Sequence, residues 1–291
     1  MTSYLAELEG GGTQIVRAKH FPTSESSEGT VDWMADSKAI IFVSNRTGHF
    51  ELYRQALDQD IAEGPLTNGY GRDPHVTPDG GSIVYFAPGE NGAPPATTAE
   101  DVMRISINGG TPQRLFTASP YSMISCARST AGECVIGEPS QDGKQMIVTI
   151  LDPQRGRGAE LFRFDVTGSA NDGSWWLDIS PDGHGLAATR SAAGPIYILS
   201  LSGEILQQFD VKGWNDVQAF IWAADGKGLF VTAAMRNGRE LLHVDLQGNA
   251  QALWENTGAS GETIAKPSPD GRHLAFSSWA TNGNMWMMED F

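Results

Sequence analysis

Short apolar runs separated by brief polar turns follow one another along nearly the whole chain. One type of turn recurs: Ser/Thr-Pro-Asp-Gly occupies residues 77–80, 180–183 and 268–271, and looser copies occupy 35–38 and 223–226. Proline presets the φ angle of the first central position, aspartate suits the second, and glycine accepts the φ > 0 conformation that follows. Such a turn between two apolar runs connects the strands of a hairpin. The pattern therefore predicts one β-hairpin, repeated along the chain.

The turns recur with a regular period. Their aspartates are Asp36, Asp79, Asp182, Asp225 and Asp270. Neighbouring aspartates are about 40–50 residues apart, except for one gap of about two periods, in which residues 127–136 form a degenerate copy. Units of this length with four short strands each are typical of the blades of a β-propeller. We therefore predict an all-β fold, a six-bladed β-propeller with four-stranded antiparallel blades.

The predicted blades fill a single domain over residues 1–291. They cover residues 31–70, 71–119, 120–170, 174–212, 213–257 and 262–291, and the first has strands at 31–34, 39–44, 50–56 and 65–67. The last has strands at 264–268, 273–278 and 284–289 and lacks a fourth. Because a closed ring leaves no sheet edge exposed, we expect an N-terminal strand to complete it. Thr13–Ala18 (residues 13–18) is the candidate, and Tyr4–Leu8 then competes with Asn284–Glu289 for one place.

Composition and charge narrow the classes of partner. The chain has 291 residues, 40% of them hydrophobic, and a formal net charge of -15. This charge argues against binding to nucleic acid or to anionic lipid, since both need basic side chains. No apolar run approaches the length of a membrane span, and the first ten residues do not resemble a signal peptide. We expect a monomer that does not insert into a membrane; its start in a mid-domain strand would suit a fragment of a longer protein.

The chain has two cysteines, Cys126 and Cys134, which flank the predicted turn at residues 129–132. They would lie on facing strands of one hairpin, close enough to consider a disulfide. The alternative is a pair of reduced, buried thiols. An extracytoplasmic location would favour the disulfide.

The repeats carry a family resemblance. Val31-Asp32-Trp33, Ile41-Phe42-Val43-Ser44-Asn45-Arg46 and Glu51-Leu52-Tyr53 resemble the PD40, or TolB-type, WD40-like repeat, and the Ser-Pro-Asp-Gly turns extend this resemblance over nearly the whole chain. Residues 57–60, 156–158, 211–214 and 282–287 resemble the C-terminal propeller of acidobacterial serine/threonine protein kinases. This resemblance implies a sensor or interaction domain of a membrane-anchored signalling protein, outside the inner membrane. A cytoplasmic location is the alternative.

Motifs for catalysis are missing from the sequence. The chain has no kinase signature, no Gly-x-Ser-x-Gly nucleophile elbow and no histidine or cysteine spacing typical of zinc. We therefore expect a non-catalytic propeller without cofactor or metal. Two alternatives stay open: a regulatory propeller of a prolyl-oligopeptidase-like peptidase, and a metal-dependent lyase or lactonase with its site in the channel.

One register position points to the central channel. His75 lies four residues before its turn aspartate, and Asp32, Asp178 and Lys266 share this register in other blades. These side chains would form a charged ring at the channel mouth if they face the axis. The alternative is local hydrogen bonding to the ends of the strands.

The two rims of the predicted ring differ in composition. The Pro-Asp-Gly turns mark one rim, and the loops between blades and between second and third strands mark the other. The second rim is rich in aromatic and charged residues, namely Arg46, Tyr70, Arg72, Tyr121, Trp175, Trp176, Trp214 and Asp216. Long loops and aromatic residues on one rim are suited to binding a protein or small-molecule ligand. The alternative for each aromatic is packing within its own loop.

Overall fold

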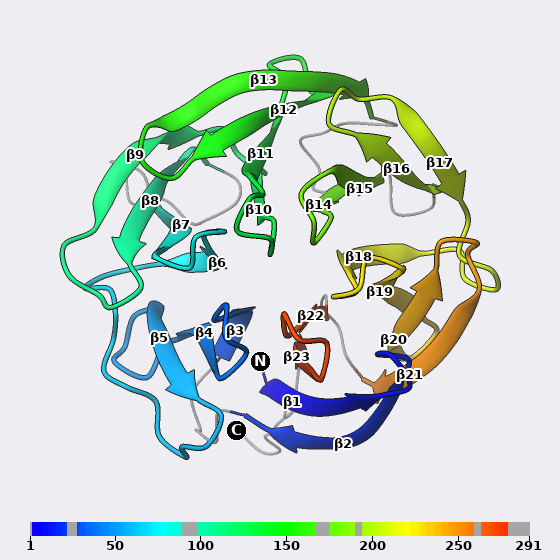
Figure 1. Cartoon of the computed structure of the whole chain (residues 1–291), viewed down its shortest axis with the longest axis horizontal. Helices are drawn as coiled ribbons and strands as arrows, with labels where there is room; N and C mark the ends of the chain where they lie inside the picture. Colours follow the sequence, from blue (N-terminus) through cyan, green and yellow to red (C-terminus); the bar gives the residue numbers. More distant parts are fainter. Residues whose placement is uncertain are drawn as a thin grey trace, which may run out of the picture.

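The chain forms a closed ring of six antiparallel sheets around a central axis (Figure 1). The computed structural model describes residues 2–21, 28–88, 98–166, 175–189, 194–258 and 263–278. All regular elements in these ranges are strands, β1 to β23. The predicted all-β, six-bladed propeller is therefore confirmed.

Each sheet is one blade, and its first strand lies nearest the axis (Figure 1). Blade one has β3 (Glu28–Trp33), β4 (Ala39–Ser44) and β5 (Glu51–Ala56). Blade two has β6 (Arg72–Val76), β7 (Ser82–Pro88), β8 (Glu100–Ser106) and β9 (Gln113–Ala118). Blade three has β10 (Met123–Cys126), β11 (Cys134–Pro139), β12 (Gln145–Asp152) and β13 (Gly156–Asp165). Blade four has β14 (Trp176–Ile179), β15 (Gly185–Thr189), β16 (Ile196–Ser200) and β17 (Ile205–Phe209). Blade five has β18 (Val217–Trp222), β19 (Gly228–Met235), β20 (Gly238–Asp245) and β21 (Ala250–Thr257).

Blade six joins the two ends of the chain. Its sheet order is β2-β1-β23-β22, with β22 (Ile264–Pro267) and β23 (His273–Ser278) inside and β1 (Thr2–Glu9) and β2 (Gln14–His20) outside. The expected closing strand thus takes the outermost place. The segment that was expected to compete, Tyr4–Leu8, takes the third place within β1, and Asn284–Glu289 lies outside the described residues.

Blade one has three regular strands. The predicted fourth strand at residues 65–67 is an irregular segment that still follows β5. The amides of Glu63, Leu66 and Gly71 donate to main-chain carbonyls of β5 and of Phe50 just before it. The hydroxyl of Thr67 accepts a hydrogen bond from the Leu52 amide (3.1 Å). This segment therefore covers the outer edge of the blade without a continuous ladder.

The repeated turns have the geometry that their sequence predicts. In blade two, Asp79 Oδ1 accepts hydrogen bonds from the Thr77 hydroxyl (2.6 Å) and from the Gly81 amide (2.9 Å). Gly80 has a φ of 69°, in the left-handed region that favours glycine. Blade one has Ser37 at the same position with a φ of 61°. In the blades that have a turn aspartate, this residue thus holds the hairpin closed.

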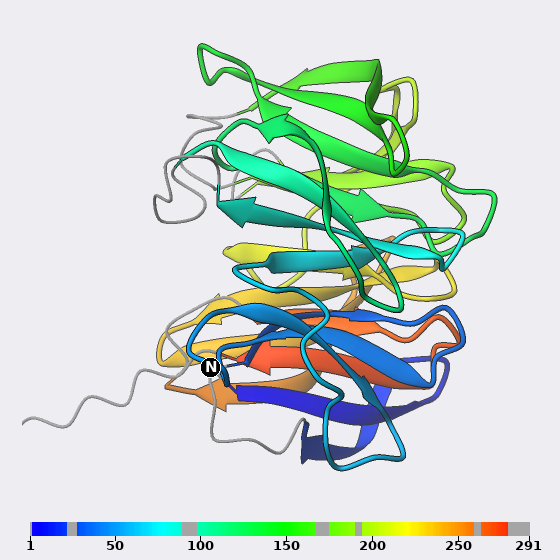
Figure 2. The same ribbon diagram turned by 90° about the vertical axis from the view of Figure 1, so that its left-hand side faces the viewer.

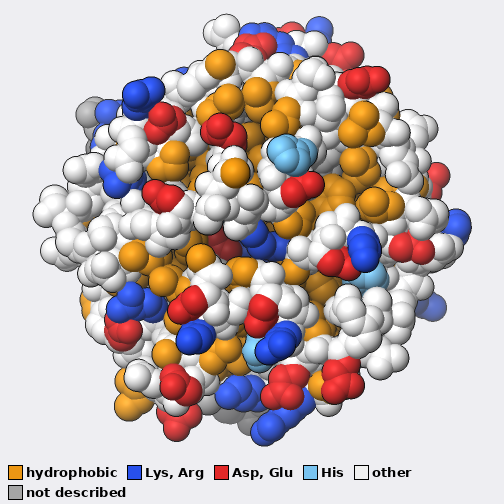
Figure 3. All heavy atoms as spheres, in the orientation of Figure 1, with side chains coloured by type: hydrophobic (Ala, Val, Ile, Leu, Met, Phe, Trp, Pro, Cys, Tyr) orange, Lys and Arg blue, Asp and Glu red, His pale blue; other side chains and the backbone are white. Residues whose placement is uncertain are grey.

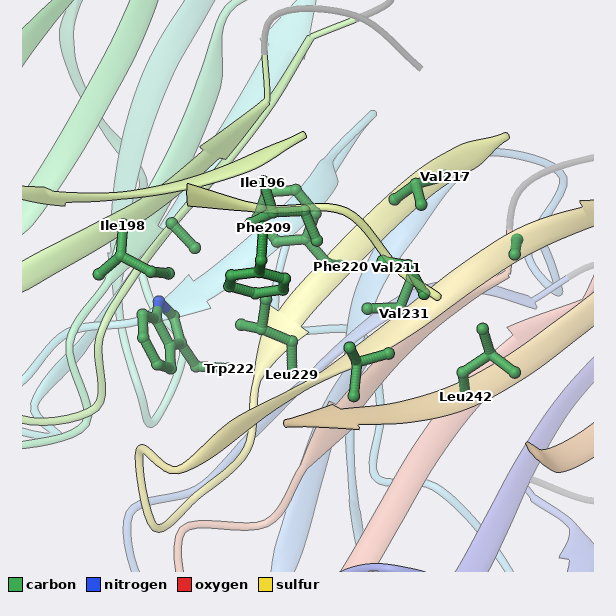
Figure 4. Packing of buried hydrophobic residues seen from close by; sticks show 13 residues of the cluster. Ile196, Ile198, Phe209, Val211, Val217, Phe220, Trp222, Leu229, Val231 and Leu242 are labelled. Atoms are coloured by element: carbon green, nitrogen blue, oxygen red, sulfur yellow. The ribbon is translucent and has the colours of Figure 1, made fainter. Parts of the chain in front are cut away.

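The hydrophobic core lies between neighbouring blades rather than within one sheet. Figure 4 shows the interface of blades four and five, where side chains of both sheets interdigitate. The labelled residues come from β16 to β20 and, for Val211, from the loop between β17 and β18: Ile196, Ile198, Phe209, Val211, Val217, Phe220, Trp222, Leu229, Val231 and Leu242. Packing between blades can be very close, since a Cβ on Gly137 would lie 2.3 Å from Leu177 of the next blade. Glycine in the middle of β11 is explained by this contact.

The ring has two distinct faces, which Figure 2 shows edge-on. We call the face with the turns after the first and third strands of each blade the turn face. The face with the loops between blades, and between second and third strands, is the loop face. The turn face points toward the viewer in Figures 1 and 3.

Candidate functional site

A small cavity lies on the axis of the ring, at its turn-face end. All six innermost strands contribute one residue at the same register position: Asp32, His75, Ser125, Asp178, Ile221 and Lys266. Arg128 also lines it, from the turn of blade three. The cavity has a volume of about 40 Å³, enough for a few water molecules or a small ion. Figure 3 shows basic and acidic side chains at this central hollow.

Asp178 connects three blades. Its Oδ1 accepts a hydrogen bond from the Ser125 hydroxyl of blade three (2.6 Å), and its Oδ2 accepts one from the Trp222 amide of blade five (2.8 Å). Its main-chain oxygen accepts a third from Trp222 Nε1 (3.1 Å). Burial raises the pKa of the Asp178 carboxyl, against the opposing charge of Arg128. The side chain therefore faces the cavity and also fastens the inner strands.

Asp32 repeats this arrangement on the other side of the ring. Its Oδ2 accepts a hydrogen bond from the Val76 amide of blade two (2.7 Å), and its Oδ1 lies 3.5 Å from Lys266 Nζ of blade six. Trp33 Nε1 donates to the main-chain oxygen of Lys266 (2.9 Å). Blades six, one and two are thus joined by the same kinds of bond as blades three, four and five.

His75 and Lys266 complete the polar lining. Lys266 Nζ lies 3.4 Å from His75 Nδ1, and His75 Nε2 lies 3.5 Å from Asp73 Oδ2. Burial alone would raise the pKa of Asp73, but the charges of His75, Lys266 and Arg72 outweigh it and lower that pKa to about 2. The basic groups of the ring therefore have acidic neighbours.

Arg128, like Ser125, lines the cavity without having been predicted from the sequence. Its Nη1 donates to the main-chain oxygen of Trp222 (3.3 Å). Burial lowers the pKa of the Arg128 guanidinium, and the charges of Asp178 and Asp32 oppose that shift. Blade three lacks the turn aspartate that marks the register elsewhere, so neither Arg128 nor Ser125 could be aligned with the other blades.

The four predicted channel residues therefore lie together. Asp32, His75, Asp178 and Lys266 all line the cavity. Asp32 and Asp178 also accept hydrogen bonds from strand amides, as in the alternative, although these amides belong to neighbouring blades. Chemically, the ring can hold water or a small polar species between two carboxylates and two cationic groups.

Three of the predicted loop-face residues are half-buried and packed on aromatic rings. The Arg46 guanidinium lies 4.6 Å from the Tyr53 ring centre, and Tyr70 meets Phe50 edge-on at 6.1 Å. Arg72 Nε donates to Glu100 Oε1 (2.8 Å), and its guanidinium lies 4.4 Å from the centre of the Phe86 ring. Burial raises the pKa of the Tyr70 hydroxyl. These side chains therefore support their loops in addition to lining the face.

The remaining loop-face residues differ in exposure. Trp175 is only 2% exposed and belongs to the core between blades three and four, so its assignment to an accessible binding surface is wrong. It lies directly before β14 and turns inward with the strand. Trp176 is half-buried and donates from Nε1 to the Phe220 carbonyl (2.6 Å), and Trp214 packs on the core of blades four and five. Tyr121 is half-buried, with a φ of 60°, and Asp216 is exposed.

The two cysteines form a disulfide. Cys126 and Cys134 face each other across β10 and β11, and their sulfur atoms are bonded. Of the two alternatives that the sequence left open, a disulfide or two reduced thiols, the structure contains the disulfide. Cys126 lines the central cavity, while Cys134 is buried in the core of blades two and three.

Within the described ranges, no group of three or more His, Cys, Asp or Glu side chains is arranged to hold a metal ion. None of the segments that the structure describes is a helix long and apolar enough to cross a bilayer.

Comparison with known proteins identifies the fold. Sequence comparisons with family models and with curated proteins return no match. A protein assigned as TolB from Agrobacterium tumefaciens has a similar structure, with a TM-score of 0.70, 15% identity, and coverage of 96% of this chain and 98% of that one. An oligogalacturonate lyase in complex with manganese gives a TM-score of 0.51 at 14% identity, over 82% of this chain and 67% of that one. A puromycin hydrolase gives 0.54 at 16% identity, over 88% of this chain and 44% of that one. The fold is thus that of TolB-like propellers, which host several functions.

Proposed function

We propose that this chain is a non-catalytic binding propeller, the sensing or scaffolding region of a larger signalling protein. The main support for the proposal is that both channel carboxylates already accept hydrogen bonds from the protein itself. Asp178 accepts hydrogen bonds from Ser125 and from the Trp222 amide, and Asp32 accepts one from the Val76 amide. A general base or nucleophile needs an oxygen directed at its substrate. Here the carboxylate oxygens hold strands together instead.

The size of the central cavity supports the same proposal. A volume of about 40 Å³ is far below the 300–1,000 Å³ or so of sites that enclose a small-molecule substrate. Recognition would therefore use the surfaces of the ring. The net charge of -15 favours a protein or small-molecule partner over nucleic acid.

The proposed parent is a membrane-anchored, receptor-like kinase with the propeller outside the inner membrane. The resemblance at residues 57–60 and 211–214 to propellers of acidobacterial kinases supports this parent. The disulfide of Cys126 and Cys134 supports an oxidising compartment, where such bonds persist. Within this proposal the propeller acts as a monomer that needs no cofactor.

The reading frame on either side of this segment tests the proposal. We expect kinase catalytic motifs upstream, followed by about 20 apolar residues that span the membrane. A downstream α/β domain with Gly-x-Ser-x-Gly would instead support the regulatory propeller of a peptidase. An alkaline phosphatase fused after the propeller in the parent protein should be active in cells if the domain is outside the inner membrane. An inactive but stable fusion would contradict that location.

A further inference from the structure

The outermost strands carry a repeated bulge. In five blades, the pairing of the third and outermost strands shifts by one residue. The extra residue is always a large aliphatic one: Val16, Leu115, Leu161, Leu206 and Leu253. A bulge bends its strand and changes the direction of the side chain. The ring thus places one apolar side chain per bulge at an equivalent position.

These equivalent side chains are not equally covered. Leu115, Leu161 and Leu253 pack partly into the core between their own blade and the next. Leu206 of blade four is 60% exposed, and its neighbour Ile205 is 47% exposed. The outer strand of blade four therefore presents apolar surface at a place where blades two, three and five partly bury it.

Leu206 borders a groove on the turn face between blades four and five. The groove has a volume of about 490 Å³, and the buried side chains of Ile198 and Trp222 form part of its lining. Its walls are the turns after the first strands of these two blades, at residues 180–185 and 222–226. The second turn has Ala224 where neighbouring turns have proline, so a small side chain borders the groove on that side. Figure 3 shows hydrophobic surface between these turns.

The groove is acidic at its walls. Asp182 and Asp225 line it together with His184, and none of the lysines and arginines in the described ranges does so. The carboxyl of Asp182 has a lowered pKa because the Ser180 hydroxyl and the His184 amide donate to it. Both carboxylates therefore favour a positively charged group beside the apolar floor.

We propose that this groove docks an extended peptide segment of a partner protein, with a large apolar side chain on Leu206 and an adjacent lysine or arginine between Asp182 and Asp225. The inference rests on the proposed binding function, for which it names a surface and a partner chemistry. A second copy of this chain would bring its own acidic turns against these carboxylates, and an anionic lipid surface would meet the same repulsion. The apolar floor with acidic walls fits a basic–apolar peptide.

Selection from a random peptide library on the immobilised protein tests the proposal, with affinities then measured by fluorescence anisotropy. The variants are Leu206→Ser and Asp182→Asn/Asp225→Asn. Val16→Ser is the matched control, because Val16 is the exposed bulge residue of blade six, with 49% exposure. We expect peptides that combine Leu, Phe or Trp with Lys or Arg. Leu206→Ser should weaken their binding about tenfold, the loss of a partly buried leucine contact. The double Asn variant should weaken it too and reduce its salt dependence.

The outcomes separate the groove from the general function. If the selected peptides bind Leu206→Ser as tightly as the wild type, the groove is not their docking site, but the proposal that the propeller binds a partner is unaffected. Enrichment of acidic or purely polar peptides, or no enrichment on the wild type, also overturns the groove. The proposed function is then judged by the reading frame of the parent alone. If Val16→Ser weakens peptide binding as much as Leu206→Ser does, exposed aliphatic residues contribute wherever they lie. That result would contradict docking in the groove as well.

Discussion

Replacement of Asp178 by alanine tests whether the channel carboxylates hold the ring together. The side chain is 8% exposed and accepts hydrogen bonds from Ser125 in blade three and the Trp222 amide in blade five. Alanine removes both bonds and leaves the Trp222 amide buried without its acceptor. We therefore expect a large loss of stability from one small substitution, spread over three blades.

The magnitude follows from the bonds that are lost. A hydrogen bond to a charged group contributes about 1.5–3 kcal/mol, and an unpaired buried amide costs about 1–3 kcal/mol. These effects overlap, so Asp178→Ala should lower the free energy of unfolding by about 3–5 kcal/mol. For a chain of 291 residues, this corresponds to a decrease in Tm of about 5–8 °C. Asp178→Asn keeps one acceptor oxygen and should lose about half as much.

Thermal and urea unfolding followed by tryptophan fluorescence provide the measurement. Asp216→Ala is the matched control, since Asp216 is an exposed carboxylate and its loss changes the net charge equally. That variant should melt within about 1 °C of the wild type. If the Tm of Asp178→Ala equals or exceeds that of the wild type, the carboxylate does not hold the blades together. A stabilised variant would indicate a buried charge kept for a ligand, and the channel would again be the candidate active site.

Three more predictions concern the turns, the disulfide and the core. The double variant Asp79→Asn/Asp182→Asn should lose less stability than the wild type when the pH falls below about 4. Hydrogen bonds from neighbouring hydroxyls lower the pKa of both carboxyls in the folded state. The two carboxylates therefore contribute to the free energy of unfolding above the unfolded pKa, and this contribution is lost as the pH falls. Urea unfolding across this pH range that keeps the wild-type slope would refute it. Cys126→Ser should lower the free energy of unfolding by about 2–3 kcal/mol under oxidising conditions, as expected for a short disulfide loop. Its Tm should equal that of the reduced wild type. If the wild type has the same Tm with and without dithiothreitol, the disulfide is absent. Trp175→Ala should lower the free energy of unfolding by about 3–5 kcal/mol because it truncates a core side chain. An unchanged Tm together with weaker partner binding would indicate that Trp175 belongs to the binding surface instead.

The blade architecture could be predicted because the turn chemistry is local. Each Pro-Asp-Gly turn specifies its own hairpin, and the period between turns then counts the blades. Closure could be predicted only in part. The choice between Tyr4–Leu8 and Asn284–Glu289 for the third place in blade six depends on pairing between the two ends of the chain, which no local signal encodes. The irregular edge of blade one at residues 65–67 was missed for the same reason.

The channel residues were accessible to sequence reasoning wherever a turn aspartate set the register. Asp32 and Asp178 were placed correctly in this way, whereas Ser125 and Arg128 were missed because blade three has no such marker. Burial on the loop face was harder to predict. Trp175 stands one residue before its strand, and its inward direction comes from packing against the neighbouring blade. The bulge at Leu206 is a one-residue shift in pairing, which a single sequence does not reveal.

The pairing of β1 with β23 has a consequence for synthesis. Within the propeller, β1 and β2 are made before the other strands, yet β23, which pairs with β1, is made only after blades one to five. At about 5–20 residues per second, this hairpin waits for tens of seconds with an open edge. During that time the nascent protein exposes an edge to which other chains can pair, so folding in the cell depends on what shields β1 until β23 has been made.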